Sequence, residues 1–389
     1  MDENILTTCL HSRHTALGAQ MSPFAGYDMP IQYRGIVEEH NAVRTACGVF
    51  DVSHMGEVIV SGPDATDFVN YIFTNDVSQA ADGECLYGMM LNERGGVVDD
   101  LLVYRFSAER YLLVINASNI AKDEAWIEER SADINPASAE GMFFRVDLEM
   151  VSEVVAELAI QGPKAEDTIE NVLGIKCSDL GFYTFKEIEI DGHKALISRT
   201  GYTGEDGFEL YAEEEIIQQA WDKLVGSGRC EPCGLGCRDT LRFEVGLPLY
   251  GDELADDITP LEAGLGMFVK LDKPHMIGRD ALLAQKAAGA PRKLVGLELA
   301  DRAIPRHGYE VLNDADEVVG HVTTGYHAIS VDKSVAMALV DARYAAQGTP
   351  LKVRIRRKTF PCTVVAKRFY KKSYKKKSDK HNQLKQAKS

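Results

Sequence analysis

One stretch is central to the fold and to the site, Asn92-Glu-Arg-Gly-Gly-Val-Val-Asp-Asp-Leu-Leu-Val-Tyr104. Its Gly-Gly pair favours a β-hairpin turn, and the apolar run that follows predicts a strand opening with two acids. Acids are depleted from strand interiors. Because side chains alternate along a strand, Asp100, Leu102 and Tyr104 should share one face, which would suit a flat, partly polar ligand. The alternative is that both acids end an exposed turn, since most acids lie in water.

This stretch belongs to a segment that the chain repeats. Val58-Ile-Val-Ser-Gly-Pro-Asp-Ala65 precedes a predicted helix over 66–73, and Leu158-Ala-Ile-Gln-Gly-Pro-Lys-Ala165 precedes another over 166–173. Proline close to a helix start is favourable, because its missing N–H would be unpaired there anyway. Each copy continues with three predicted strands and a second helix. We therefore predict two related halves, with a ligand site at their seam if they pack about a pseudo-dyad.

The second copy contains an unusual loop at the place of the acidic hairpin, Arg199-Thr-Gly-Tyr-Thr-Gly-Glu-Asp-Gly-Phe-Glu209. Its three glycines allow tight turns and close backbone approach. The loop combines an aromatic ring with carboxylates, and a plain acidic surface loop is the alternative. It does not match the phosphate-binding pattern Gly-x-x-x-x-Gly-Lys-Ser/Thr.

Two arginines follow on a predicted helix. Arg238 and Arg242 lie four residues apart and therefore on one face. Such a pair suits a carboxylate, either on a ligand or within the protein. The two options remain open at this point.

From Lys293 onward the sequence pattern predicts short strands, the last of them over 363–369. Six such strands with turn signals predict a small antiparallel barrel. The expected boundary is near Lys273-Pro274. The predicted division is 1–272 for a duplicated catalytic region (copies about 50–150 and 151–272), 273–370 for the barrel and 371–389 for a basic, disordered tail.

Composition and charge narrow the function classes. The chain has 389 residues, 45% of them hydrophobic and 26% charged, as in ordinary globular proteins. It has no apolar run of membrane-spanning length and no leader-like start, so we expect a cytoplasmic protein without a membrane role. The net charge is −16, but residues 371–389 carry +7, which leaves −23 for the rest. An acidic body argues against nucleic-acid binding, whereas the tail could contact an acidic partner.

The eight cysteines are scattered and do not suggest a disulfide framework. Cys230, Cys233 and Cys237 are closely spaced, but no second Cys or His pair lies at zinc-finger distance. We expect small buried or loop thiols and no metal.

Six longer motifs occur in order along the chain, up to about Tyr370. They are Phe24-Ala-Gly-Tyr-Asp-Met-Pro-Ile-Gln-Tyr33, Phe50-Asp-Val-Ser-His-Met-Gly56, Asn92-Glu-Arg-Gly-Gly-Val-Val-Asp-Asp-Leu101, the loop from Arg199 to Glu209, Gly234-Leu-Gly-Cys-Arg-Asp-Thr-Leu-Arg242 and Ile277-Gly-Arg-Asp-Ala-Leu282. Together they resemble the T-proteins of the glycine cleavage system, the tetrahydrofolate-dependent aminomethyltransferases. Several long motifs in one order make this a specific match.

The resemblance implies an α+β, three-domain folate-binding architecture, with two related α/β halves around a central cleft and a C-terminal antiparallel β-barrel. It implies transfer of a one-carbon unit from the aminomethyl-dihydrolipoyl arm of the H-protein to tetrahydrofolate, with release of ammonia and formation of methylenetetrahydrofolate. It also implies a functional link to the glycine decarboxylase and dihydrolipoyl dehydrogenase components, and no metal.

The resemblance further singles out the second acid, Asp100, as the catalytic residue. The folate-contacting residues that it implies are Met55, Tyr87, Tyr104, Asn116, Tyr183, Tyr202, Glu209 and Arg238. These types fit a pterin, which is flat and has a hydrogen-bonding edge. Glu209 suits that edge, and Arg238 suits a glutamate-tail carboxylate or a neighbouring acid.

The chain departs from the family pattern at Leu247 and Met267, where relatives often carry aromatic residues, and in its long Lys-rich tail. Two relatives of the same fold are alternatives: a folate-dependent demethylase and a non-catalytic iron–sulfur-assembly protein. The second would carry a Lys-Gly-Cys-Tyr-Thr-Gly-Gln type loop. Arg199-Thr-Gly-Tyr-Thr-Gly-Glu205 counts against it, whereas the demethylase remains open.

Overall fold

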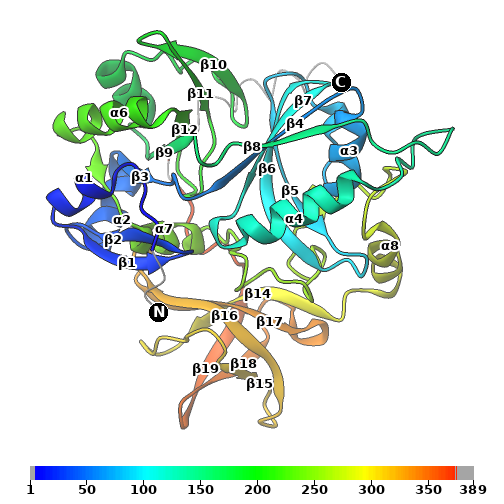
Figure 1. Ribbon diagram of the computed structural model, residues 1–389. Helices are drawn as coiled ribbons and strands as arrows, with labels where there is room; N and C mark the ends of the chain where they lie inside the picture. Colours follow the sequence, from blue (N-terminus) through cyan, green and yellow to red (C-terminus); the bar gives the residue numbers. More distant parts are fainter. Residues whose placement is uncertain (1–4, 373, 375–389) are drawn as a thin grey trace.

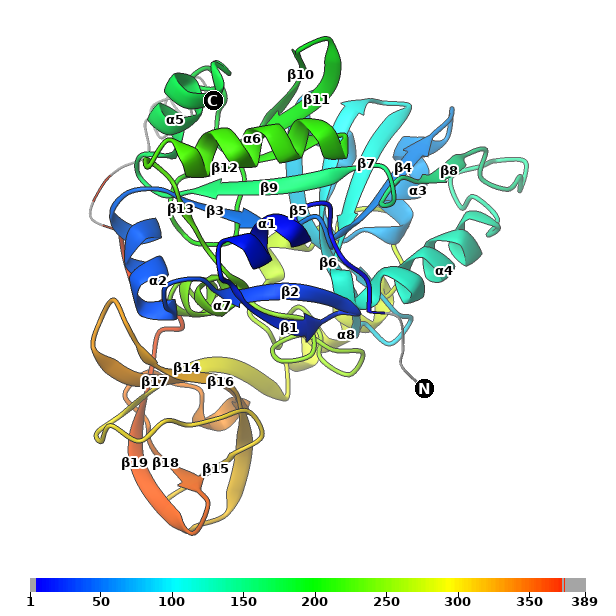
Figure 2. The same ribbon diagram turned by 60° about the vertical axis from the view of Figure 1, so that its left-hand side comes forward.

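A computed structural model describes residues 5–372 and residue 374. Figures 1 and 2 show two β-sheets side by side, helices against them, and a separate barrel below. The first sheet has the order β5-β6-β7-β4-β8 and the second the order β10-β11-β12-β9-β3-β13. Four strands of each sheet therefore follow the same order, which makes the two halves related as predicted.

The first half runs from β4 to β8. Its elements are β4 (Gly56–Ser61), α3 (Ala65–Ile72), β5 (Cys85–Leu91), β6 (Val97–Ser107), β7 (Arg110–Ile115), α4 (Ile120–Ser131) and β8 (Asp147–Met150). The second half has β9 (Ala156–Gln161), α5 (Ala165–Thr168), β10 (Phe185–Ile190), β11 (His193–Ser198), β12 (Gly207–Ala212), α6 (Glu214–Gly226), β13 (Glu231–Pro232) and α7 (Leu235–Glu244). An N-terminal layer precedes them, with α1 (His11–Ala16), β1 (Gln20–Phe24), β2 (Tyr27–Gln32), α2 (Ile36–Thr45) and β3 (Gly48–Asp51).

The two halves exchange their edge strands. β3 comes just before the first copy in the chain but pairs with β9 of the second sheet, whereas β8 comes just before the second copy and pairs with β4. The crossing points are held by reciprocal hydrogen bonds. The backbone N–H of Glu57 donates to the hydroxyl of Ser152 over 2.8 Å, and that of Glu157 donates to the hydroxyl of Ser53 over 3.0 Å. The exchange makes the halves one body with an approximate two-fold relation.

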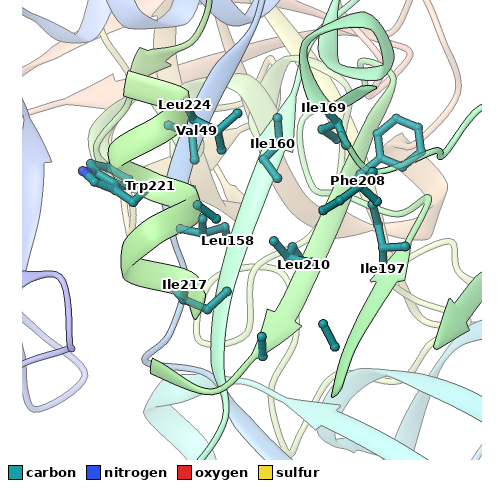
Figure 3. Packing of buried hydrophobic residues seen from close by; sticks show 14 of the residues in the cluster. Val49, Leu158, Ile160, Ile169, Ile197, Phe208, Leu210, Ile217, Trp221 and Leu224 are labelled. Atoms are coloured by element: carbon teal, nitrogen blue, oxygen red, sulfur yellow. The ribbon is translucent and has the colours of Figure 1, made fainter. Parts of the chain in front are cut away.

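Apolar residues of each sheet face the helices of their own half. Figure 3 shows this core in the second half, where Trp221 and Leu224 of α6 lie over the strands. The opposite faces of the two sheets meet at a seam. The buried residues of the seam come from both halves and are Cys85, Tyr104, Leu112, Val114, Phe185, Leu196 and Tyr211. The seam therefore brings strand residues about one hundred positions apart into contact.

The barrel begins after α8 (Arg279–Ala288) and consists of six antiparallel strands in the closed order β14-β17-β16-β15-β18-β19. These are β14 (Arg292–Leu299), β15 (Glu310–Leu312), β16 (Val318–Ala328), β17 (Lys333–Asp341), β18 (Pro350–Ile355) and β19 (Lys358–Val365). This confirms the predicted barrel and, with the mixed helix and sheet content, the α+β class.

Two predicted elements have different bounds. The strand expected over 363–369 is β19, Lys358–Val365, because a two-residue turn at Arg356, whose φ is +57°, starts the returning strand at once. The helix expected over 166–173 is shorter, since α5 ends at Thr168 and a π-helical turn, Ile169–Leu173, follows. Neither change moves the strands that carry the site.

The chain returns to the second half after the barrel. We call residues 366–372 and Tyr374 the C-terminal strap. The N–H groups of Phe369 and Tyr370 donate to the carbonyl of Glu244 over 2.9 and 2.8 Å. The Arg44 guanidinium lies over the Tyr370 ring, and the Tyr374 hydroxyl donates to Glu205 over 2.6 Å. The strap thus reaches the loop between β11 and β12. Of the predicted tail, residues 373 and 375–389 lie outside the described residues.

None of the helices within residues 5–372 is both long and apolar enough to cross a bilayer.

Candidate functional site

The two acids of the opening stretch lie on opposite faces of β6. Asp99 has no exposed surface and lies on the side of Leu101 and Val103, which belong to the core of the first half. Asp100 lies on the side of Tyr104, at the seam, and is partly buried. The alternative of an exposed acidic turn is therefore wrong, and the predicted alternation holds.

Asn116, at the end of β7, ties the two acids together. Its side-chain amide donates to Oδ1 of Asp99 over 2.9 Å and to Oδ1 of Asp100 over 3.0 Å. It also donates to the Asp100 carbonyl, while its backbone N–H donates to Oδ2 of Asp99 over 3.0 Å. Asn119 adds a bond of 2.8 Å to Oδ1 of Asp99. Both carboxylates are thus fixed from the β7–α4 connection.

The other oxygen of Asp100 accepts a hydrogen bond of 2.8 Å from the Tyr87 hydroxyl on β5. Burial and the neighbouring Asp99 charge raise the pKa of Asp100 to about 7, and the bonds from Tyr87 and Asn116 act in the opposite direction. A carboxyl group with a pKa near neutrality can bind or release a proton under physiological conditions. The edge of the Tyr87 ring meets Phe268, with ring centroids 4.9 Å apart.

Glu209 and Tyr104 meet across the seam. The Tyr104 hydroxyl lies 2.9 Å from that of Tyr211 and 3.3 Å from that of Ser198, and it donates to Glu209 over 3.5 Å. Thr200 also donates to Glu209. Tyr104 is fully buried, so its ring belongs to the seam packing. Burial raises the pKa of Glu209, whereas Thr200 and Arg238 lower it.

The structure separates the two arginines. Arg242 is fully buried and pairs with Glu253 and Asp239, each over 2.7 Å, so its partners are internal. Arg238 has its guanidinium over the Tyr202 ring, 5.0 Å from the centroid. Its Nη1 is buried and has no hydrogen-bond partner among the described residues. Of these two arginines, Arg238 is therefore the one with a buried donor that no described residue uses.

Three further sequence-predicted residues surround this region. Met55 packs against the seam residues and against the cluster beneath α7, so it lies between the two. Tyr183 has a φ of +60° and packs at the edge of the seam. Tyr202 donates its hydroxyl to the Pro248 carbonyl and lies near enough to Asp100 for the two to interact electrostatically.

Several buried polar atoms at the site lack partners among the described residues. They include Nδ1 of His54, one oxygen of Glu157 and Nη1 of Arg238. Burial lowers the pKa of His54 to about 4, so its ring is neutral at physiological pH and one ring nitrogen is an acceptor. Buried polar groups are normally hydrogen-bonded. These atoms therefore offer hydrogen-bond donors and acceptors to a polar ligand.

The closely spaced cysteines are buried thiols, as expected. Cys233, Cys237 and Glu39 place potential ligand atoms within 4.8 Å of one another. The Glu39 carboxylate, however, accepts hydrogen bonds from the backbone N–H groups of Tyr33, Arg34, Gly35 and Gly234. The Glu39 side chain serves to hold the chain before α2 against the start of α7.

Sequence reasoning missed residues that support the site. Asn119 and Asp123 lie behind Asp99, while Ser198, Thr200 and Tyr211 contact the Tyr104–Glu209 group. Alternation along β12 could have found Tyr211, which shares the face of Glu209. The Asn116–Asn119 spacing could have indicated a polar turn before α4. Of the two departures, Leu247 and Met267, the second is 73% exposed.

The comparisons with known proteins agree with this architecture. Residues 10–273 match the GCVT N-terminal domain and residues 292–371 match the glycine cleavage T-protein C-terminal barrel domain. The first match covers the duplicated body and the second covers the barrel, so both parts of the fold correspond to domains of glycine cleavage T-proteins. The chain belongs to the glycine cleavage T-protein family.

Relatives match over nearly the whole chain. The aminomethyltransferase of Caldanaerobacter subterraneus subsp. tengcongensis is 50% identical over 378 residues, which is 96% of this chain and 98% of the relative. That of Alkaliphilus oremlandii is 48% identical over 373 residues, 95% and 98% of the two chains. The structure of glycine cleavage system aminomethyltransferase T from Bartonella henselae has a TM-score of 0.88 at 33% identity and covers 96% of this chain and 100% of that one.

Proposed function

We propose that this chain is the aminomethyltransferase of a glycine cleavage system and that Asp100 is its catalytic residue. The enzyme class rests on the family and on relatives that carry this name over nearly the full chain. The catalytic assignment rests on one observation: Asp100 is the partly buried acid at the seam, held between Tyr87 and Asn116 with its pKa raised to about 7.

The donor in this reaction is a carbon substituted by sulfur and nitrogen on the dihydrolipoyl arm of the H-protein. When ammonia leaves, that carbon becomes a cation stabilised by the adjacent sulfur. The folate nitrogen attacks this carbon and loses a proton, and cleavage of the carbon–sulfur bond then releases the dihydrolipoyl thiol. The Asp100 carboxylate, held in one orientation by Tyr87 and Asn116, stabilises the positive charge and accepts the proton from the folate nitrogen. Bound tetrahydrofolate supplies the nitrogen nucleophile. We assign no metal to the reaction.

The folate site in this proposal combines residues of both halves. Glu209 accepts from the pterin edge, and Nη1 of Arg238 donates to a carboxylate, either of the glutamate tail or of a neighbouring acid. Aromatic and Met side chains pack on the flat ring. The residues proposed to contact folate are Met55, Tyr87, Asn116, Tyr183, Tyr202, Glu209 and Arg238. Tyr104, which is fully buried, supports them from within the seam through its hydrogen bond to Glu209. The unpartnered atoms of His54 and Glu157 support a polar ligand here.

The proposal also includes the partner proteins, the compartment and the domain division of the chain. The partner is the lipoylated H-protein, with a functional link to the glycine decarboxylase and dihydrolipoyl dehydrogenase components, in the cytoplasm. We infer three parts of the chain: 1–272 as the folate-binding region, 273–370 as the barrel and 371–389 as a basic tail. The two family matches, which end and begin at residues 273 and 292, support this division.

The decisive experiment measures ammonia release from aminomethylated H-protein in the presence of tetrahydrofolate. The chain should release ammonia, and Asp100→Asn should lose most turnover while keeping its melting temperature and its affinity for tetrahydrofolate. Glu109→Gln, an exposed acid at the β6–β7 turn, is the matched control and should keep full activity. Full turnover by Asp100→Asn would refute the catalytic assignment. Methyl transfer from an amino or sulfonio donor without ammonia would instead indicate a demethylase.

A further inference from the structure

A second buried acid lies behind Asp99. Asp123, in the first turn of α4, has no exposed surface, and neither of its oxygens has a hydrogen-bond donor among the described residues. The nearest cation is Lys122, whose Nζ is 3.6 Å from Oδ1 but donates to the Val98 carbonyl and lies over the Tyr250 ring. A buried, ionised carboxylate without donors is too costly to persist.

The partner of Asp123 is the other carboxyl group, Asp99. Asp99 already accepts three hydrogen bonds, two from Asn116 and one from Asn119. Two buried carboxyl groups in contact cannot both ionise, so they share one proton. Three donors point at Asp99 and none of the described donors points at Asp123, so the shared proton lies on Asp123. Burial and the contact with Asp99 accordingly raise the pKa of Asp123 to about 10.

We propose that Asp123 is a positioning residue: it remains protonated, donates its O–H to Asp99, and so fixes Asp99 as a singly charged, immobile neighbour of Asp100. Asp99 and Asp100 are adjacent on β6 and share the Asn116 amide. A change in the charge or the rotamer of Asp99 therefore reaches Asp100 directly. The expected effect on kcat rests on the proposed catalytic role of Asp100, whereas the protonation of Asp123 does not.

Among the described residues, the charged groups that act on Asp123 are Lys122 of α4 itself and Asp99 of β6. Tyr250, from the segment after α7, contacts Lys122 and acts on Asp99. With one proton, the pair Asp99 and Asp123 carries a single negative charge beside Asp100. If both carboxyl groups were ionised, the pair would carry two negative charges.

The kinetic test compares two replacements in the full chain. Asp123→Asn keeps a neutral donor to Asp99, whereas Asp123→Leu has similar size and no donor. Asp123→Leu should lower kcat about tenfold, with a KM for tetrahydrofolate within about twofold of wild type, because the loss falls on a positioning bond. Asp123→Asn should rescue most of that loss and keep the wild-type pH profile. Glu128→Gln, an exposed acid on α4, is the matched control.

An opposite outcome would overturn the proposal. If Asp123 were ionised, Asp123→Asn would remove a negative charge near Asp100, lower the pKa of Asp100 and move the acid limb of the kcat profile to lower pH. Equal losses in Asp123→Asn and Asp123→Leu would also refute it, because the neutral donor would then have no role.

A second measurement does not depend on turnover. A carboxyl group whose pKa is higher in the folded than in the unfolded chain makes stability fall as pH rises between the two values. The melting temperature of Asp123→Asn, relative to wild type, should therefore increase from about pH 5 to about pH 9. A difference that stays constant with pH would refute the protonated form of Asp123. If wild-type turnover were absent while this shift was present, only the proposed function would fail.

Discussion

The hydroxyl of Tyr87 donates a 2.8 Å hydrogen bond to Oδ2 of Asp100 from the neighbouring strand. Tyr87 and Leu102 are directly opposite in the β5–β6 ladder, so the tyrosine reaches diagonally to the acid. The bond stabilises the ionised form of Asp100. It therefore opposes the effect of burial on the pKa of that carboxyl group.

Removal of this hydroxyl should make Asp100 harder to ionise. A hydrogen bond to a charged group contributes about 1.5–3 kcal/mol, so Tyr87→Phe should raise the pKa of Asp100 by about one unit or more. The acid limb of the kcat profile should then move from about pH 7 to higher pH. Tyr71→Phe is the control, because Tyr71 donates to Asp133, away from the site. An unmoved profile would show that Asp100 does not control this limb.

The two arginines of α7 should respond differently to the same replacement. Arg238→Gln should weaken tetrahydrofolate binding about tenfold or more with little change in stability, because no described residue accepts a hydrogen bond from Nη1. Arg242→Gln should lower the free energy of unfolding by about 3 kcal/mol, since it removes the positive charge that is paired with the buried Glu253 carboxylate. Calorimetric titration and denaturant unfolding of both variants provide the check. The reverse pattern would contradict the separation of their roles.

Gly96, in the opening stretch, should tolerate no side chain. A Cβ at this position would lie 1.8 Å from the carbonyl oxygen of Asp256 and 2.9 Å from the Asn92 side chain. Backbone cannot yield as a flexible side chain does, so Gly96→Ala should cost about 3 kcal/mol of unfolding free energy. Gly226→Ala at the end of α6 has nothing within 4 Å and should be neutral or slightly stabilising. Chemical denaturation compares the two.

Lys273 should be important for stability, although it is a buried cation. Its Nζ donates to the backbone carbonyls of Asn70, Phe73 and Asn75, while burial lowers its pKa to about 7. Lys273→Met should lower the free energy of unfolding by about 3 kcal/mol, because three carbonyls lose their donor. In the wild type, the lowered pKa makes this lysine's contribution to stability grow from pH 7 upward. A pH-independent stability difference between the two proteins would contradict this.

The sequence was most informative about features that depend on the residue pattern of a single strand or helix. Alternation on β6 placed Asp100 with Tyr104, and the repeated Gly-Pro motifs predicted two halves. The residue pattern left the choice between Arg238 and Arg242 open, because the choice depends on Glu253, which meets Arg242 only in the folded chain. The family resemblance alone singled out Arg238. The exchange of β3 and β8 was missed for the same reason: local patterns predict a strand but not its partner.

The role of Asp123 could not be predicted from the sequence either. In the sequence it is an ordinary acid in the first turn of a helix, where carboxylates are favoured by the helix dipole. Its special environment arises from the packing of α4 against β6. Likewise, the start of β19 was misplaced because the tight turn at Arg356 has no glycine to mark it.

The C-terminal strap has a consequence for how the protein is made. Tyr374 holds Glu205 and Asp206 in the loop after β11, and Tyr370 lies beneath Arg44 of α2. Ribosomes release a chain from its N-terminus, so these two contacts form only after residues 370 and 374 have emerged. Until then, the loop that leads to Glu209 lacks its final support. We therefore expect a nascent chain to complete the packing of this loop later than the strands of either sheet, all of which are synthesised before the strap.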